Sequence, residues 1–100
     1  GFKDPAAVLV GGTLEEHLRQ LCRKHSVPVA DPTTGRPRKA EQLNQDVAGS
    51  NAYDTGQQKD VTTWLDLRNK AAHGRYNEYG PEKVDLMLQG VRLFLRQYPA

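Results

Sequence analysis

The chain has 100 residues, of which 37% are hydrophobic and 7% aromatic, and its formal net charge at pH 7 is +2. This length predicts one domain with a modest core. The small charge excludes a strongly basic nucleic-acid-binding protein but not a local basic site.

There is no apolar run long enough for a membrane-spanning helix. The lone Cys22 rules out an intramolecular disulfide, so we expect a cytoplasmic setting. Because the chain begins with Gly1 rather than Met, we expect residues 1–100 to be one domain excised from a longer protein.

The first predicted helix has Asp4 as its N-cap and Pro5 as its first residue, and it ends at Val27-Pro28. Apolar or nearly apolar side chains recur along it at helical spacing: Val10, Leu14, His17, Leu18, Leu21, Cys22 and His25. Two glycines, Gly11 and Gly12, interrupt this pattern, and each costs about 1 kcal/mol in an exposed helix. We therefore expect them to permit the close approach of another helix.

Residues 26–37 contain three prolines and one glycine, a composition that predicts a long loop. The end of this loop is basic, with Arg36, Arg38 and Lys39. A short second helix is expected from about Arg38 to Val47, and residues 49–53 close it.

The third helix is predicted from Thr55 to His73, with Gly74 in the left-handed conformation just beyond its end. The fourth begins with Pro81. Its apolar stripe comprises Val84, Met87, Leu88, Val91, Leu95 and Tyr98, widened by Leu86, Leu93 and Phe94. So broad a face predicts either the central helix or one that contacts both the core and a partner. With no strand pattern, the sequence predicts an all-α, four-helix bundle.

The segment 67–74, Leu-Arg-Asn-Lys-Ala-Ala-His-Gly, carries the strongest signal for function. Arg68 falls within an apolar stripe formed by Val61, Trp64, Leu65 and Ala72. An unpaired charge is costly in such a position, so a buried acid, a subunit interface or a bound phosphate must compensate it. The candidate acids are Glu15, Glu16 and Asp66. If one of them is the partner, the arginine has a structural role, which does not exclude a role in a site.

Arg68, Asn69 and His73 together supply the groups that metal-free phosphodiester cleavage requires. His73 would serve as general base or acid, because a histidine side chain can gain or lose a proton near neutral pH, although it would also interact favourably with the helix dipole. Arg68 would hold the phosphate and stabilise the developing charge. Asn69 shares a face with His73 and would fix the imidazole tautomer or contact a phosphate oxygen. Because Arg68 and His73 lie about 140° apart around an ideal helix, a site shared across a homodimer would unite them.

The pattern Arg68-Asn69-x-x-x-His73, at the end of the third of four helices, resembles the motif of the HEPN superfamily (higher eukaryotes and prokaryotes nucleotide-binding). That motif is an arginine followed after four to six residues by a histidine, often with a polar residue directly after the arginine. The run from Ala6 to Tyr98 also resembles a group of small bacterial domains, through LEEHLRQLC at 14–22 and WLDLRNKAAHG at 64–74.

This resemblance implies a HEPN-like bundle and metal-independent endoribonuclease activity by a homodimer. The implied settings are toxin–antitoxin systems, phage defence or RNA processing. Many members of the superfamily are inactive and serve as binding or dimerisation modules.

Several other residues have two interpretations each. A group of basic residues would either follow a phosphate backbone or only solubilise the surface: Lys70, Arg75, Arg36, Arg38 and Lys39. Tyr76 and Tyr79 would either stack on bases or cap the core. Cys22 and His25 have the spacing of half a zinc site, but without a second ligand pair they predict packing. We therefore expect no metal and no cofactor.

The sequence thus leaves open three functions: a metal-independent endoribonuclease, a non-catalytic dimerisation or RNA-binding module of a larger protein, and nucleotide binding without hydrolysis. The expected partners are a second copy of the chain, RNA, and other domains of the parent protein, but no membrane.

Overall fold

A computed structural model of the chain describes residues 3–100. The described part contains four α-helices and one short 3-10 helix: α1 (Lys3–Lys24), α2 (Ala40–Gly49), α3 (Thr55–Ala72), η1 (Tyr76–Glu78) and α4 (Pro81–Gln97). It has no strand beyond an isolated bridge between Ala30 and Pro37. The prediction of an all-α domain of four packed helices is confirmed. None of the described helices is both long and apolar enough to cross a membrane.

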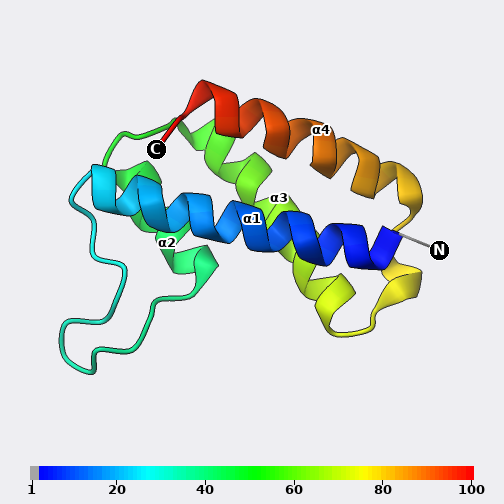
Figure 1. Cartoon of the computed structure of the whole chain (residues 1–100), viewed down its shortest axis with the longest axis horizontal. Coiled ribbons are helices and arrows are strands. Elements are labelled where there is room, and N and C mark those ends of the chain that lie inside the picture. Colours follow the sequence, from blue (N-terminus) through cyan, green and yellow to red (C-terminus); the bar gives the residue numbers. More distant parts are fainter. Residues whose placement is uncertain (1–2) are drawn as a thin grey trace.

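The central element is α1, which packs against each of the other three α-helices (Figure 1). The interpretation of α4 as the central helix is therefore wrong. One side of α4 enters the core through Val84, Met87, Val91 and Phe94. Leu86 and Leu93, which widen its stripe in the sequence, remain 65% and 48% exposed. Their apolar surface is left open in a single copy of the chain.

The core is built around the Phe94 ring, which is 1% exposed. It makes edge contacts with Tyr53 and Trp64, at centroid distances of 5.4 and 6.1 Å. His17 also packs against it, and its Nε2 atom lies 2.7 Å from the carbonyl oxygen of Tyr98. His17 is thus a partly buried histidine with a hydrogen-bond partner, as its place on the apolar stripe predicts.

The helix boundaries differ from the predicted ones in a few places. Asp4 lies inside α1 rather than at its N-cap, and its carboxylate accepts a hydrogen bond from the Tyr79 hydroxyl. Because Lys39 has extended backbone angles (φ −70°, ψ 155°), α2 begins at Ala40 rather than at Arg38. Helix α3 ends at Ala72, one residue early, and Gly74 has the predicted left-handed conformation, with φ 73°.

Gly11 is the point of close approach between α1 and α3. A Cβ atom at Gly11 would lie 2.0 Å from Cγ of Arg68 and 2.7 Å from its Cβ, whereas a Cβ at Gly12 would meet nothing within 4 Å. The expectation of close approach is therefore confirmed for Gly11 and wrong for Gly12. With no side chain at Gly11, the stem of Arg68 can run directly across α1.

Replacing these glycines tests that contact. Gly11→Ala should lower the free energy of unfolding by about 1–3 kcal/mol, because the added methyl group overpacks the crossing. Gly12→Ala is the matched control, and it should raise stability by about 0.5–1 kcal/mol because it fills open space within a helix. Urea denaturation measures both changes. Equal stability of the two variants would contradict the proposed role of Gly11.

Candidate functional site

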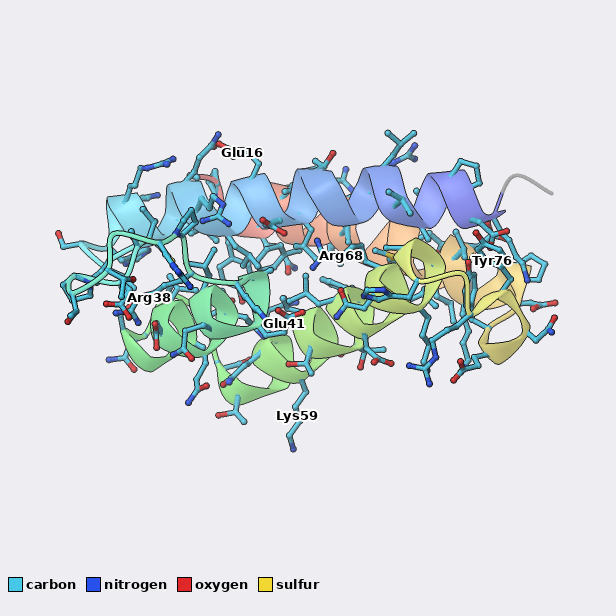
Figure 2. The ribbon with its side chains drawn as sticks, turned by 90° about the horizontal axis from the view of Figure 1, so that it is seen from below. Glu16, Arg38, Glu41, Lys59, Arg68 and Tyr76 are labelled. Carbon is cyan, nitrogen blue, oxygen red and sulfur yellow. The ribbon has the colours of Figure 1, made fainter. Side chains whose placement is uncertain are left out.

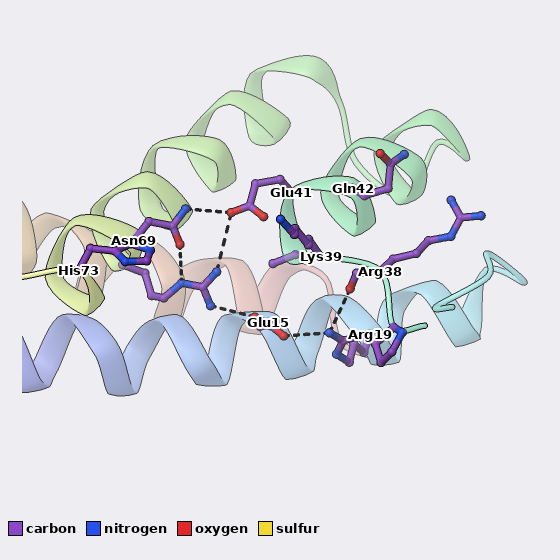
Figure 3. Close-up of a pocket in the computed structure, with 11 residues that line it drawn as sticks. Glu15, Arg19, Arg38, Lys39, Glu41, Gln42, Asn69 and His73 are labelled. Carbon is purple, nitrogen blue, oxygen red and sulfur yellow. Dashed lines mark hydrogen bonds and ion pairs between the residues drawn. The ribbon is translucent and has the colours of Figure 1, made fainter. Parts of the chain in front are cut away.

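A cleft of about 710 Å³ opens between α1, the first turn of α2 and the C-terminal end of α3 (Figures 2 and 3). It brings together the three predicted catalytic residues, Arg68, Asn69 and His73. Its remaining charged lining comes from α1, from the end of the long loop and from the first turn of α2: Glu15 and Arg19, then Arg38 and Lys39, and then Glu41. The cleft therefore combines four basic side chains, two carboxylates and one imidazole among the described residues.

Arg68 extends from α3 toward α1 (Figure 2), and its guanidinium group contacts three side chains. Its Nη1 donates to Oε1 of Glu15 at 2.8 Å, and its Nε donates to Oδ1 of Asn69 at 3.0 Å. Its Nη2 lies 3.8 Å from Oε1 of Glu41. Only 18% of the side chain is exposed. Of the three ways in which this charge could be compensated, the described residues show an acid, the partly buried Glu15.

Glu15 is the principal partner of Arg68, and its carboxylate bridges two guanidinium groups. Its second oxygen accepts a hydrogen bond from Nη2 of Arg19 at 2.9 Å. The hydrogen bond from Arg68 is the main cause that holds the pKa of Glu15 below its ordinary value, against the opposing effect of partial burial. The same Nη2 of Arg19 donates to the carbonyl oxygen of Arg38 at 3.2 Å. A chain of hydrogen bonds thus links Arg68 to the end of the long loop.

The other two candidate acids are engaged elsewhere. Glu16 lies 4.0 Å from Arg23, and Asp66 pairs with Lys70 at 3.1 Å on its own helix. Neither residue lines the cleft. The carboxylates that compensate the positive charge of Arg68 therefore belong to α1 and α2, not to α3.

Asn69 orients Arg68 rather than His73. Its amide oxygen accepts from Arg68, and its Nδ2 donates to Oε1 of Glu41 at 3.0 Å. Both the oxygen and the nitrogen of the Asn69 amide therefore form hydrogen bonds, and neither of these bonds is to the imidazole of His73. Asn69 and Glu41 together form a fixed frame around the guanidinium group.

His73 stands at the open end of the site. It is the C-cap residue of α3, with φ −95° and ψ 11°, and it is exposed. Among the described residues, no group hydrogen-bonds to its ring. The N–H of His73 still donates to the carbonyl oxygen of Asn69 at 3.0 Å, as it would in a helix, and yet Arg68 and His73 line the same cleft of one chain. The angular argument for a homodimer therefore loses its basis, and the homodimer stays a prediction.

The predicted phosphate-binding residues divide into two groups. Arg38 and Lys39 line the cleft, and Arg38 is paired with Asp46 at 3.0 Å while Lys39 is exposed. Arg36 is exposed in the loop and is not part of the lining.

Lys70 and Arg75 also lie outside the lining, although both are close to the motif in sequence. Lys70 is paired with Asp66, and Nη2 of Arg75 donates to Glu78 at 3.0 Å. A separation of two residues turns Lys70 about 200° around α3 from Arg68, which places it on another side of the helix.

Two charged residues of the cleft, Arg19 and Glu41, are not among the site residues that the sequence predicts. Arg19 follows Glu15 by one helical turn, and this i,i+4 spacing is the one local signal for their ion pair. Glu41 gives no such signal, because its contact with Asn69 depends on where α2 packs.

The packing predicted for Cys22 and His25 is confirmed for Cys22 and wrong for His25. Cys22 is buried, with burial raising the pKa of its thiol, and His25 is exposed. The described part of the chain contains no cluster of three or more metal-ligating side chains.

Comparisons of the chain with family models, with curated proteins and with solved structures give no match. The chemistry of the cleft is therefore the starting point for a function.

The pairing of Glu15 predicts a pH-dependent stability. Its folded-state pKa lies below the ordinary value of 4.5, so the pair stabilises the fold above that pH and the contribution is lost as pH falls through the folded-state pKa. Glu15→Gln should lower the free energy of unfolding by about 1–2 kcal/mol near neutral pH. The difference from the native chain should narrow on acidification.

Urea denaturation from pH 7 to about pH 3 measures this difference. Glu16→Gln is the control, because the Glu16 side chain is 59% exposed and has only a long ion pair with Arg23 and a 3.4 Å hydrogen bond from Gln20. A difference between the native chain and Glu15→Gln that stays constant over the whole range would contradict the pairing.

Proposed function

We propose that this chain is a HEPN-like domain that binds single-stranded RNA in the cleft and cleaves it without a metal ion, at a site to which two copies of the chain contribute. The observation that carries the proposal is the meeting of Arg68, an exposed His73 and the basic residues Arg19 and Lys39 in one cleft. The HEPN part of the proposal rests on the Arg68-Asn69-x-x-x-His73 motif and on its place at the end of the third of four helices.

The proposed reaction uses the 2′-hydroxyl of the RNA as nucleophile. Its oxygen attacks the adjacent phosphorus while His73 takes its proton, and the bond to the 5′-oxygen breaks. The imidazolium of His73 returns this proton, through solvent, to the leaving 5′-oxygen, so the products are a 2′,3′-cyclic phosphate and a 5′-hydroxyl and the imidazole is regenerated. Arg68 stabilises the charge on the phosphorane with the N–H groups that Glu15 and Asn69 leave unused, since a guanidinium has five.

The composition of the cleft favours a polyanion over a single phosphate. Its basic side chains outnumber its carboxylates, and Lys39 and Arg19 lie away from His73 along the cleft (Figure 3). A strand with one phosphate at Arg68 would bring a neighbouring phosphate toward Lys39. In this proposal the occupant is RNA in the cytoplasm, in a defence, toxin–antitoxin or RNA-processing setting.

A second candidate function is a non-catalytic dimerisation or RNA-binding module of a larger protein. The observation that favours it is the engagement of Arg68, which is 18% exposed and contacts Glu15, Glu41 and Asn69 without any ligand. In this alternative Arg68 is a structural ion that joins α1, α2 and α3. The two candidates differ in whether removing His73 changes a reaction.

A cleavage assay in EDTA separates them. The native chain should cut a fluorescent single-stranded RNA and leave 2′,3′-cyclic phosphate ends. His73→Ala should lower the rate by about 10²–10⁴-fold, because the proton-transfer group is lost. His25→Ala, which removes another exposed histidine, should leave the rate unchanged. Cleavage by His73→Ala at the native rate, or no cleavage by the folded native chain, would contradict the nuclease proposal.

Mixing two inactive variants tests whether the site is shared between copies. If each site takes Arg68 from one copy and His73 from the other, an equal mixture of Arg68→Ala and His73→Ala should recover about a quarter of the native activity, since half of the dimers are mixed and each has one intact site. If one chain supplies both residues, the mixture stays inactive. Sedimentation velocity of the mixture verifies that dimers are present.

A further inference from the structure

A second hollow, of about 610 Å³, lies beside the His73 end of the cleft. It is lined by Asp4, Pro5, Val8, Leu9, Ala71 and Tyr76. On α1, Val8 precedes Gly11 by one turn, so it continues the side of α1 that carries Gly11 and Glu15. From the segment after α3 comes Tyr76, which lies beside Gly74, the residue that follows His73. Figure 2 shows Arg68 and Tyr76 along the same side of α1, so the hollow and the cleft follow one another along the α1–α3 contact.

The Tyr76 side chain lies beside Gly74, the residue after His73, and much of it remains accessible. Tyr76 is 48% exposed. A Cβ atom at Gly74 would lie 3.8 Å from both Cζ and the hydroxyl oxygen of Tyr76. Nζ of Lys3 donates to the carbonyl oxygen of Tyr76 at 3.0 Å, which ties its backbone to the start of α1. The ring is therefore an accessible aromatic surface beside the residue that follows the catalytic histidine of the proposal.

The neighbouring tyrosine has a different role. Tyr79 is 6% exposed, its hydroxyl is bonded to Asp4, and burial raises its pKa to about 12. It is a packing residue. Of the two interpretations that the sequence leaves open for these tyrosines, packing against the core applies to Tyr79. Only Tyr76 is accessible to a ligand, so the stacking interpretation is left for Tyr76 alone.

The lining of the hollow suits a flat, uncharged group. Val8, Leu9, Pro5 and Ala71 are apolar, and Leu9 is 72% exposed. Among the described lining residues the single charged one is Asp4, a carboxylate that would repel a phosphate. Aromatic side chains beside a basic groove stack nucleobases of single-stranded nucleic acids.

We infer that this hollow is a base-binding subsite, in which a nucleobase of the RNA whose phosphate lies at Arg68 and His73 stacks on the Tyr76 ring. The inference rests on the proposed function, because it takes the phosphate position from it. It adds a residue that recognises bases to a cleft that otherwise recognises the backbone. The chain should therefore distinguish RNA from a polyphosphate backbone of equal charge.

The test is the binding of two uncleavable strands, measured by fluorescence anisotropy. One is a short single-stranded RNA whose 2′-hydroxyls are replaced by fluorine, and the other has the same backbone without bases. The native chain should bind the first about 5- to 100-fold more tightly. Tyr76→Leu should lose this preference, and Tyr76→Phe, which keeps the ring, should retain it.

Two further variants separate a failure of the subsite from a failure of the proposed function. Lys39→Ala should weaken binding of both strands alike, because it removes a backbone contact. Leu93→Ala, which trims another exposed apolar residue on α4, should change neither. Native preference in Tyr76→Leu, with Lys39→Ala still weakening both strands, would overturn the subsite alone.

Two other outcomes also overturn the inference. If Tyr76→Leu converts a dimer to monomers in sedimentation velocity and keeps the base preference, the hollow is a contact between copies. If the folded native chain binds neither strand, the subsite and the proposed function both fail.

Discussion

The structure depends on the place where Arg68 crosses α1. Its stem passes over Gly11, and its guanidinium group ends on the carboxylate of Glu15. This crossing sets how closely α1 and α3 pack, and it fixes a cation at the edge of the core with only 18% of the side chain exposed. Because Glu15 also holds Arg19, and Arg19 holds the carbonyl oxygen of Arg38, the same interaction positions the second cation and the end of the loop. The cleft is therefore a consequence of how one charge is accommodated.

The same interaction gives Arg68 two roles that require different things of its side chain. As a structural ion it needs all of its partners, and Glu15, Asn69 and Glu41 provide them. As a phosphate ligand it needs free N–H groups at a fixed place. A guanidinium has five donors, so both roles are compatible if the phosphate takes those that the protein leaves unused. The proposed catalysis then uses an arginine that is already oriented before RNA arrives, which lowers the cost of reorganisation during the reaction.

The sequence predicts the helices better than it predicts the site. Local signals were sufficient for Pro81 at the start of α4, for Gly74 after α3 and for the anomalous charge of Arg68, because each depends on a few neighbouring residues. The cleft depends on which faces meet. Lys70 and Arg75 are near the motif in sequence but lie outside the cleft, whereas Glu41 is 28 residues from Asn69 and is bonded to it. Asp4 shows the same limit, since its contact with Tyr79 joins residues that are 75 positions apart in the chain.

The central claim is that the cleft holds an RNA phosphate between Arg68 and His73. The most direct measurement is a nuclear magnetic resonance titration of the ¹⁵N-labelled chain in EDTA with a short RNA whose 2′-hydroxyls are replaced by fluorine. The account predicts that the largest shifts occur at the Nη–H groups of Arg68, at the His73 ring and at the backbone amides of Lys39 and Glu41. Unchanged signals from these groups at saturating RNA, or shifts confined to Lys70 and Arg75, would contradict it.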